Sequence, residues 1–290
     1  QHKQPQESNV LDRAQMELEK YKKDEALLPH LEESYFQAGT LGGGNHFIEI
    51  QEDEVGMACI MLHSGSRRFG NMIGQYFNQM AKRLNAKYFS SVPEEYNLSF
   101  LPTDCEEGQR YLNWMHLAME FAFENRALML QKVKQVFAEF VQKYTDLTPA
   151  FSDEINCHHN YASLEEHFDE TVWVHRKGAI HAAEGETAII PGAMGTNSYI
   201  VKGLGNADSF LTSSHGAGRR YSRTKAVESF SVESVMVDLK QRNVVLGKLK
   251  KSDVAEESRF AYKNIEQVME NQKDLSVPVK RLTTVGVVKG

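Results

Sequence analysis

The sequence predicts an α+β protein in which helices flank mixed β-sheets. Helix-type and strand-type patterns both occur, and they do not alternate regularly as βαβ units would. The 290 residues are 41% hydrophobic and 25% charged, which is ordinary globular composition and enough length for a substantial core. Because no internal repeat, linker or composition change divides the chain, we expect one domain over residues 1–290.

The first part of the chain predicts one helix and two strands. Residues 11–28 are polar and predict a solvent-exposed helix. Residues 46–50 predict a strand, and the apolar run 57–62 predicts a second, buried strand that ends at His63.

The middle of the chain predicts mainly helix. Residues 71–89 have apolar side chains at helical spacing on one face, namely Ile73, Phe77, Met80 and Leu84. Residues 98–104 predict irregular structure. Residues 107–144 contain too many apolar side chains for a single exposed helix face, so a helix pair or one bent helix is expected.

The last part of the chain predicts strands with one short helix. Strands are expected at residues 171–174, 187–190, 198–201 and 277–288, and a helix at 264–271.

Bulk composition excludes several classes of protein. No apolar run reaches the roughly 18 residues of a membrane span, and no secretory signal opens the chain. The three cysteines are odd in number and widely spaced, which favours a reduced, cytoplasmic setting. The chain begins at Gln1 rather than Met, and we expect residues upstream of it to be missing.

Four histidines lie in four separate segments rich in glycine or asparagine. These segments are GGGNH (42–46), HSGSRR (63–68), CHHN (157–160) and SHGAGR (214–219). Imidazoles bind metals and attack phosphorus, glycines expose backbone N–H groups, and arginines bind phosphates. The combination predicts a metal-dependent site for phosphoryl or nucleotidyl transfer.

Each segment also has a purely structural interpretation. The triple glycine could simply form a tight turn. It matches neither of two known nucleotide-binding motifs, the Walker A loop and GxGxxG. His63 could be a hydrogen-bonded residue at a strand end, and His215 could be incidental to a glycine-rich loop. Adjacent side chains on a strand point in opposite directions, so at most one of His158 and His159 can face a given site.

The net charge is −6, but basic residues gather in or next to the histidine segments. They are Arg67, Arg68, Arg176, Lys177, Arg219, Arg220, Arg223 and Lys225. A local basic site on an acidic protein is compatible with a polyanionic substrate.

Taken together, the segments resemble the RtcB-type RNA-splicing ligases. The resemblance rests on GTLGGGNHFIEI (39–50), HSGSRRFG (63–70), CHHNY (157–161), VHRKGA (174–179), PGAMGTNSYIV (191–201), HGAGRRYSR (215–223), AYK (261–263) and VVKG (287–290). It implies a GTP- and Mn²⁺-dependent ligase, with two Mn²⁺ per site, that joins an RNA 3′-phosphate or 2′,3′-cyclic phosphate end to a 5′-hydroxyl end. RNA repair or tRNA splicing is the implied process, and an activating protein is a further candidate partner.

The resemblance also implies residue roles. His215 corresponds to the nucleophile that attacks the α-phosphorus of GTP and becomes guanylylated. His46, His63 and His159 correspond to manganese ligands. The positions that hold the guanine nucleotide are Asn45, Glu49, Asn160, Gly192, Ala193, Met194, Gly195, Thr196, Gly216, Ala217, Gly218, Tyr262 and Lys289. Arg67 and Arg68 correspond to contacts with RNA phosphates.

The chain departs from the family pattern at two places. The family carries an Asp-x-x-Cys metal motif upstream of the first glycine segment, and no Asp-x-x-Cys occurs in this chain. The resemblance therefore implies that the N-terminal portion of the catalytic domain is absent and that manganese binds more weakly. Ala193 stands where a hydroxyl residue is frequent. Two alternatives are a metal-dependent phosphoesterase that uses the same histidines and an inactive nucleotide-binding fragment.

Overall fold

The chain divides into a helical unit and a sheet unit. The computed structural model describes residues 1–248 and 254–290. The helical unit comprises residues 1–40 and 64–149, and the sheet unit comprises residues 41–63 and 150–290. Because both helices and mixed sheets are present, the predicted α+β class is confirmed.

The helical unit is built from four α-helices, with short 3₁₀ turns between them. They are α1 (Asn9–Met16), α2 (Leu28–Ser34), α3 (Arg67–Lys87) and α4 (Glu106–Tyr144). The core of this unit is apolar and includes Leu11, Leu31, Phe69, Phe77, Trp114 and Phe121. Trp114 is fully buried, and its indole N–H donates to Asp24, which also binds Arg110.

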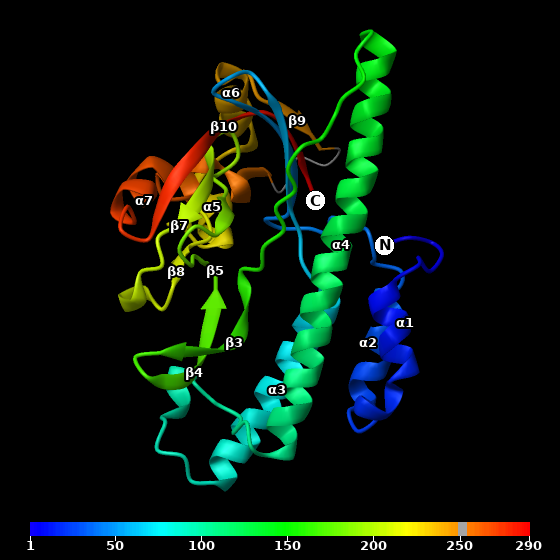
Figure 1. The fold of residues 1–290 in the computed structure, drawn as a ribbon, viewed down its shortest axis with the longest axis vertical. Helices are drawn as coiled ribbons and strands as arrows, with labels where there is room; N and C mark the ends of the chain where they lie inside the picture. Colours follow the sequence, from blue (N-terminus) through cyan, green and yellow to red (C-terminus); the bar gives the residue numbers. More distant parts are fainter. Residues whose placement is uncertain (249–253) are drawn as a thin grey trace. The chain divides into compact units, whose positions relative to one another are not determined.

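One prediction for the helical unit is wrong. The expected exposed helix over residues 11–28 is instead α1, two 3₁₀ turns and the start of α2, and its Leu11 and Leu27 are buried. The few apolar residues among many charged ones hid this buried face. Of the two alternatives expected for residues 107–144, a helix pair or one bent helix, the structure has a single helix, α4, which Figure 1 shows in green.

A six-stranded sheet forms the centre of the sheet unit. Its strands are β1 (Phe47–Asp53), β2 (Ala58–His63), β6 (Thr187–Ile190), β7 (Ser198–Gly203), β9 (Val245–Gly247) and β10 (Ser276–Lys289). The order is β2-β1-β10-β7-β6, and β9 pairs with β10 in parallel, whereas the other pairs are antiparallel. Figure 1 shows β10 (red) beside β7.

Two hairpin-sized sheets complete this unit. One pairs β3 (Asn160–His167) with β4 (Glu170–Lys177), and the other pairs β5 (Ala179–His181) with β8 (Thr212–Ser214). The helices are α5 (Arg223–Ser229), α6 (Val232–Gln241) and α7 (Ile265–Asn271). These elements surround two apolar clusters that pack on the six-stranded sheet and near β5.

Most predicted strands are confirmed, but β2 is not buried. It is an edge strand, and the exposed side chain of Met57 precedes it. The elements β3, β5, β8, β9, α5 and α6 were not predicted, because they are short or polar and depend on their neighbours for stability. Among the described residues, no helix combines the length and apolarity needed to cross a membrane.

Candidate functional site

The four histidines come together in the sheet unit. His46 precedes β1, His63 ends β2, His159 precedes β3, and His215 follows β8. Pairing of β1 with β2 sets Phe47 opposite His63, and the rings of His46 and His63 lie 5.4 Å apart between centroids. The Nε2 atoms of His63 and His159 are 3.1 Å apart. Residues far apart in the sequence therefore form one imidazole cluster.

His215 joins the cluster by stacking on His159. Their ring centroids are 5.3 Å apart and their planes differ by 5°. His158 is turned elsewhere, with its ring 5.9 Å from that of Tyr161. Of this adjacent pair, His159 contacts both His63 and His215.

Burial favours the neutral form of two histidines of the cluster. Burial and the neighbouring His159, His46 and His215 lower the pKa of His63 well below its usual range. Burial also lowers the pKa of His215, against a hydrogen bond to the backbone of Gly178 that raises it. A neutral imidazole keeps the lone pair that both metal binding and nucleophilic attack require.

The His63–His159 pair has the spacing expected of two ligands to one divalent metal ion, but a complete ligand set is not present within the described ranges of the chain. Two imidazole nitrogens bound to one ion at about 2.1 Å lie roughly 3.0–3.4 Å apart, and the His63–His159 distance falls in this range. His46 Nδ1 lies 2.7 Å from the carbonyl oxygen of Leu41 and donates to it, which places the lone pair on Nε2. The described residues contain no group of three or more His, Cys, Asp or Glu side chains arranged to hold a metal.

Gly178 connects His159 to His215. Its backbone N–H donates to the carbonyl oxygen of His159 at 2.8 Å and lies 3.3 Å from Asn160 Oδ1. Its φ is +66°, and a Cβ there would lie 3.1 Å from Cε1 of His215. Both the backbone conformation and the close ring contact require glycine.

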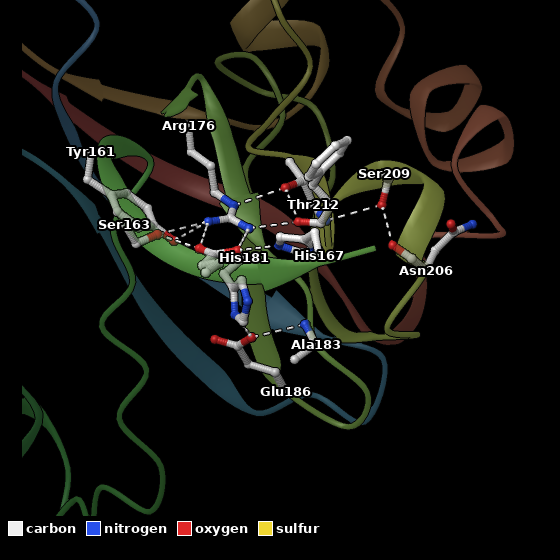
Figure 2. A network of polar contacts seen from close by, with 12 residues as sticks. Tyr161, Ser163, His167, Arg176, His181, Ala183, Glu186, Asn206, Ser209 and Thr212 are labelled. Atoms are coloured by element: carbon white, nitrogen blue, oxygen red, sulfur yellow. Dashed lines mark hydrogen bonds and ion pairs between the residues drawn. The ribbon is translucent and has the colours of Figure 1, made fainter. Parts of the chain in front are cut away.

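Arg176 on β4 links β3 to β8 (Figure 2). It is 1% exposed and donates to the carbonyl oxygen of Phe210 (2.8 Å) and to Thr212 Oγ1 (2.9 Å), at the start of β8. It also binds both carboxylate oxygens of Glu165 on β3, including a 3.0 Å bond to Oε2. Arg176 thus fixes β8, which leads directly into His215.

Two arginines of the predicted basic group are paired with carboxylates, one partly buried (Glu165) and one buried (Glu257). Arg176 binds Glu165, and Arg219 Nη1 lies 3.1 Å from Glu257 Oε1. Carboxylates within the sheet unit therefore compensate the charge of these two arginines.

Glu257 organises residues that were predicted to hold the nucleotide. Its Oε2 accepts from Lys289 Nζ at 2.9 Å and from the Tyr262 hydroxyl at 2.8 Å. Arg219 also donates to that hydroxyl at 2.9 Å. Sequence reasoning missed Glu257, since nothing in its local pattern distinguishes it from the exposed glutamates.

Glu49 lies on β1 and is 4% exposed. Burial raises its pKa to about 7, although hydrogen bonds from Thr284 and Gln51 and the charge of Lys289 act in the opposite direction. A buried carboxylate whose charge is incompletely compensated is a common feature of functional sites.

The loop Gly192–Thr196 is held by hydrogen bonds of its own backbone. The N–H of Gly192 donates to Ser198 Oγ at 3.1 Å, and Thr196 N–H donates to the Ala193 carbonyl at 2.9 Å. Met194 is 6% exposed and packs in the apolar core. The side chain of Met194 is therefore occupied, and only backbone groups of this residue can face a nucleotide.

The first glycine-rich segment lies against the C-terminal residue and against Arg223. Gly42 and Gly44 have φ of +80° and +76°. A Cβ on Gly290 would lie 1.4 Å from the Gly42 carbonyl oxygen, and one on Gly44 would lie 2.7 Å from the Arg223 guanidinium. These positions need glycine for close approach.

Four remaining predicted residues lie in the loop after β8 or precede β1. The backbone of Ala217 donates to the carbonyl of Pro191 at 3.1 Å, and its side chain is buried in the core with Ile180. Gly216 lies beside Pro191, Gly218 has φ of +70°, and Asn45 is partly exposed.

Arg67 and Arg68 belong to the helical unit, where they begin α3. Arg67 Nε donates to Thr40 Oγ1 at 3.3 Å, and Arg68 lies 3.7 Å from Glu33 at the surface.

This geometry can be compared with known proteins. The family model described as tRNA-splicing ligase RtcB matches residues 2–290. The chain belongs to the RtcB family. Relatives of this RtcB-family chain include the RNA-splicing ligase RtcB of Escherichia coli K12, 43% identical over 258 residues that cover 89% of this chain and 62% of the relative.

Other RtcB proteins match at lower identity. The RNA-splicing ligase RtcB of Mycobacterium tuberculosis is 33% identical over 88% of this chain and 65% of its own length. The tRNA-splicing ligase RtcB of Thermococcus kodakarensis is 32% identical over 88% of this chain and 60% of its own length. The chain thus spans about three fifths of the length of these RtcB relatives.

Proposed function

We propose that the chain carries the guanylylation site of an RNA ligase that joins a 3′-phosphate or 2′,3′-cyclic phosphate end to a 5′-hydroxyl end. The stacking of a neutral His215 on His159, which itself contacts His63, carries this proposal. Membership of the RtcB family and relatives named RNA-splicing ligases support it. RNA repair or tRNA splicing is the process that fits.

His215 is the proposed nucleophile. Its lone pair attacks the α-phosphorus of GTP, a phosphorus–nitrogen bond forms, and the bond to the leaving pyrophosphate breaks. An oxygen of the RNA 3′-phosphate then attacks that phosphorus and releases His215. The 5′-hydroxyl attacks the activated 3′-phosphorus, loses its proton, and displaces GMP.

His46, His63 and His159 would hold manganese. When bound, the metal would neutralise the crowded phosphates and orient the attack. The three imidazoles supply lone pairs because burial keeps His63 neutral and the Leu41 carbonyl selects the Nδ1–H form of His46. An imidazole set alone does not distinguish manganese from other divalent transition metals, so the choice of metal rests on the family.

The guanine nucleotide would lie among the residues around Glu49. The Glu49 carboxylate would accept hydrogen bonds from the N1–H and 2-amino groups of guanine. Lys289 and Tyr262 are held by Glu257, and the backbones of Gly192–Thr196 and Gly216–Gly218 would face the phosphates or ribose. Asn45 and Asn160 complete the proposed set.

Incubation with GTP and Mn²⁺, followed by intact-mass measurement, tests the proposal. The expected result is an acid-labile adduct with the mass of GMP, which is lost in His215→Ala. His158→Ala is a matched control that should keep the adduct, because the His158 ring lies against Tyr161 instead. RNA cleavage without an adduct would favour a metal-dependent phosphoesterase, and GTP binding without an adduct would favour a nucleotide-binding fragment.

A further inference from the structure

A row of buried polar side chains crosses the centre of the six-stranded sheet next to Glu49. The row consists of Gln51 on β1, Thr284 on β10 and Ser198 on β7. With Glu49, all four are 4% exposed or less. Polar groups are costly to bury, and a sheet face that served only as core would be apolar.

The row connects the Glu49 carboxylate to both ends of the loop Gly192–Thr196. Gln51 Nε2 donates to Glu49 Oε2 at 2.7 Å and to Ser198 Oγ at 3.1 Å. Ser198 Oγ in turn accepts from the N–H of Gly192. Through these bonds, the orientation of the carboxylate depends on the start of the loop.

Thr284 lies between the carboxylate and the other end of the loop, and its single hydroxyl proton can be donated to one of these two acceptors at a time. Its hydroxyl lies 3.1 Å from Glu49 Oε2 and 3.2 Å from the carbonyl oxygen of Thr196, at the other end of the loop. Gln51 and Thr284 both contact Oε2, so neither of them uses Glu49 Oε1. These two hydrogen bonds therefore hold the carboxylate by one oxygen.

A β-bulge makes this arrangement possible. Glu49 pairs with Val287 and Gln51 pairs with Thr284, so the four residues 284–287 lie opposite the three residues 49–51. In regular strands, Thr284 and Val287 would point to opposite faces, whereas here both are buried. Bulges commonly redirect side chains beside functional sites.

An unsatisfied acceptor also points to a role beyond packing. Within the part of the chain that the structure describes, Gln51 Oε1 is buried and has no hydrogen-bond partner. Such an atom destabilises a fold, and an apolar side chain of similar size would avoid the loss. Gln51 is thus suited to positioning Glu49 rather than to filling the core.

We infer that Gln51, Thr284 and Ser198 are positioning residues that set the selectivity for guanine, by holding the Glu49 carboxylate and the loop Gly192–Thr196 as one unit. This inference rests on the proposed function, in which Glu49 binds the guanine base. Guanine offers both N1–H and a 2-amino group to a correctly oriented carboxylate, and hypoxanthine offers N1–H alone.

Binding of GTP and ITP in the presence of Mn²⁺ tests the inference. The unaltered chain should bind GTP at least about tenfold more tightly than ITP, as expected for a hydrogen bond to a charged group. Thr284→Val is nearly isosteric, and it should reduce that ratio to within about threefold. Gln51→Met and Ser198→Ala should act in the same direction. Thr283→Val is the matched control, because Thr283 is the exposed neighbour on β10 and should keep the ratio.

The pH profile separates positioning from a general loss of stability. Hydrogen bonds from Thr284 and Gln51 lower the pKa of Glu49, with Lys289 acting in the same direction. Thr284→Val should therefore move the pH dependence of GTP affinity to higher pH. Equal losses for GTP and ITP with an unchanged pH profile would overturn the inference and leave the proposed function standing. Failure of the unaltered chain to bind GTP would overturn both.

Discussion

Glu165 and Glu49 are two carboxylates of the sheet unit with opposite electrostatics. Glu165 is compensated by Arg176, Ser163 and His167, and these bonds outweigh burial and lower its pKa to about 2. Burial of Glu49 outweighs its hydrogen bonds and raises its pKa to about 7. The first carboxylate stabilises the strands that hold His215. Burying the charged form of Glu49 destabilises the fold, which is the pattern expected of a carboxylate that binds a ligand.

Breaking the compensated pair should have the largest effect. Arg176→Met leaves Glu165 partly buried without its main partner and should lower the free energy of unfolding by about 3–5 kcal/mol. Urea denaturation at pH 7 measures the loss. Lys177→Met, at the exposed next position, is the control and should change it by under about 1 kcal/mol. A loss below 1 kcal/mol for Arg176→Met would mean that the pair does not stabilise these strands.

The two carboxylates should titrate about five pH units apart. Glu165 contributes stability that is present above pH 4.5 and is lost as the pH falls toward about 2. Glu49 contributes stability that is present below pH 4.5 and is lost as the pH rises through about 7. Each of these pKa shifts corresponds to a change of about 3 kcal/mol in the free energy of unfolding. Side-chain ¹³C NMR, assigned with Glu49→Gln and Glu165→Gln, measures both midpoints, and similar midpoints would remove the contrast.

Replacing the uncompensated carboxylate should stabilise the fold while impairing binding. Relative to the unaltered chain, Glu49→Gln should gain about 2–3 kcal/mol in unfolding free energy between pH 5 and pH 8, because the variant has no charge to bury. GTP affinity should fall at least about tenfold. Denaturation at the two pH values and GTP titration measure these effects. A variant whose stability relative to the unaltered chain is the same at both pH values would contradict the prediction.

The smallest expected effect concerns the contact between Gly178 and His215. Gly178→Ala adds backbone strain at φ +66° and places a methyl group against the ring, so formation of the GMP adduct should slow about tenfold. Gly185→Ala is the matched control, since Gly185 has φ of +77° and no atom within 4 Å of its Cβ position. Both variants should lose roughly 1 kcal/mol of stability. Equal adduct rates in the two variants would show that the ring contact is unimportant.

Local patterns accounted for much of the fold. The strands at residues 187–190 and 198–201 and the helix near 264–271 were predictable, because alternating or periodic apolar side chains and a capping Asn264 are local signals. The polar strand β3 was not predictable, because its burial depends on the strand beside it.

The sequence by itself determined the family and the four histidine segments, because glycine, histidine and arginine at fixed spacing can be recognised from the sequence alone. Only the tertiary structure decided which of these groups act together. It selected His159 over His158, neutralised Arg176 with Glu165, and revealed Glu257. The physical reason is that burial and charge compensation arise between residues distant in sequence, where no local pattern records them.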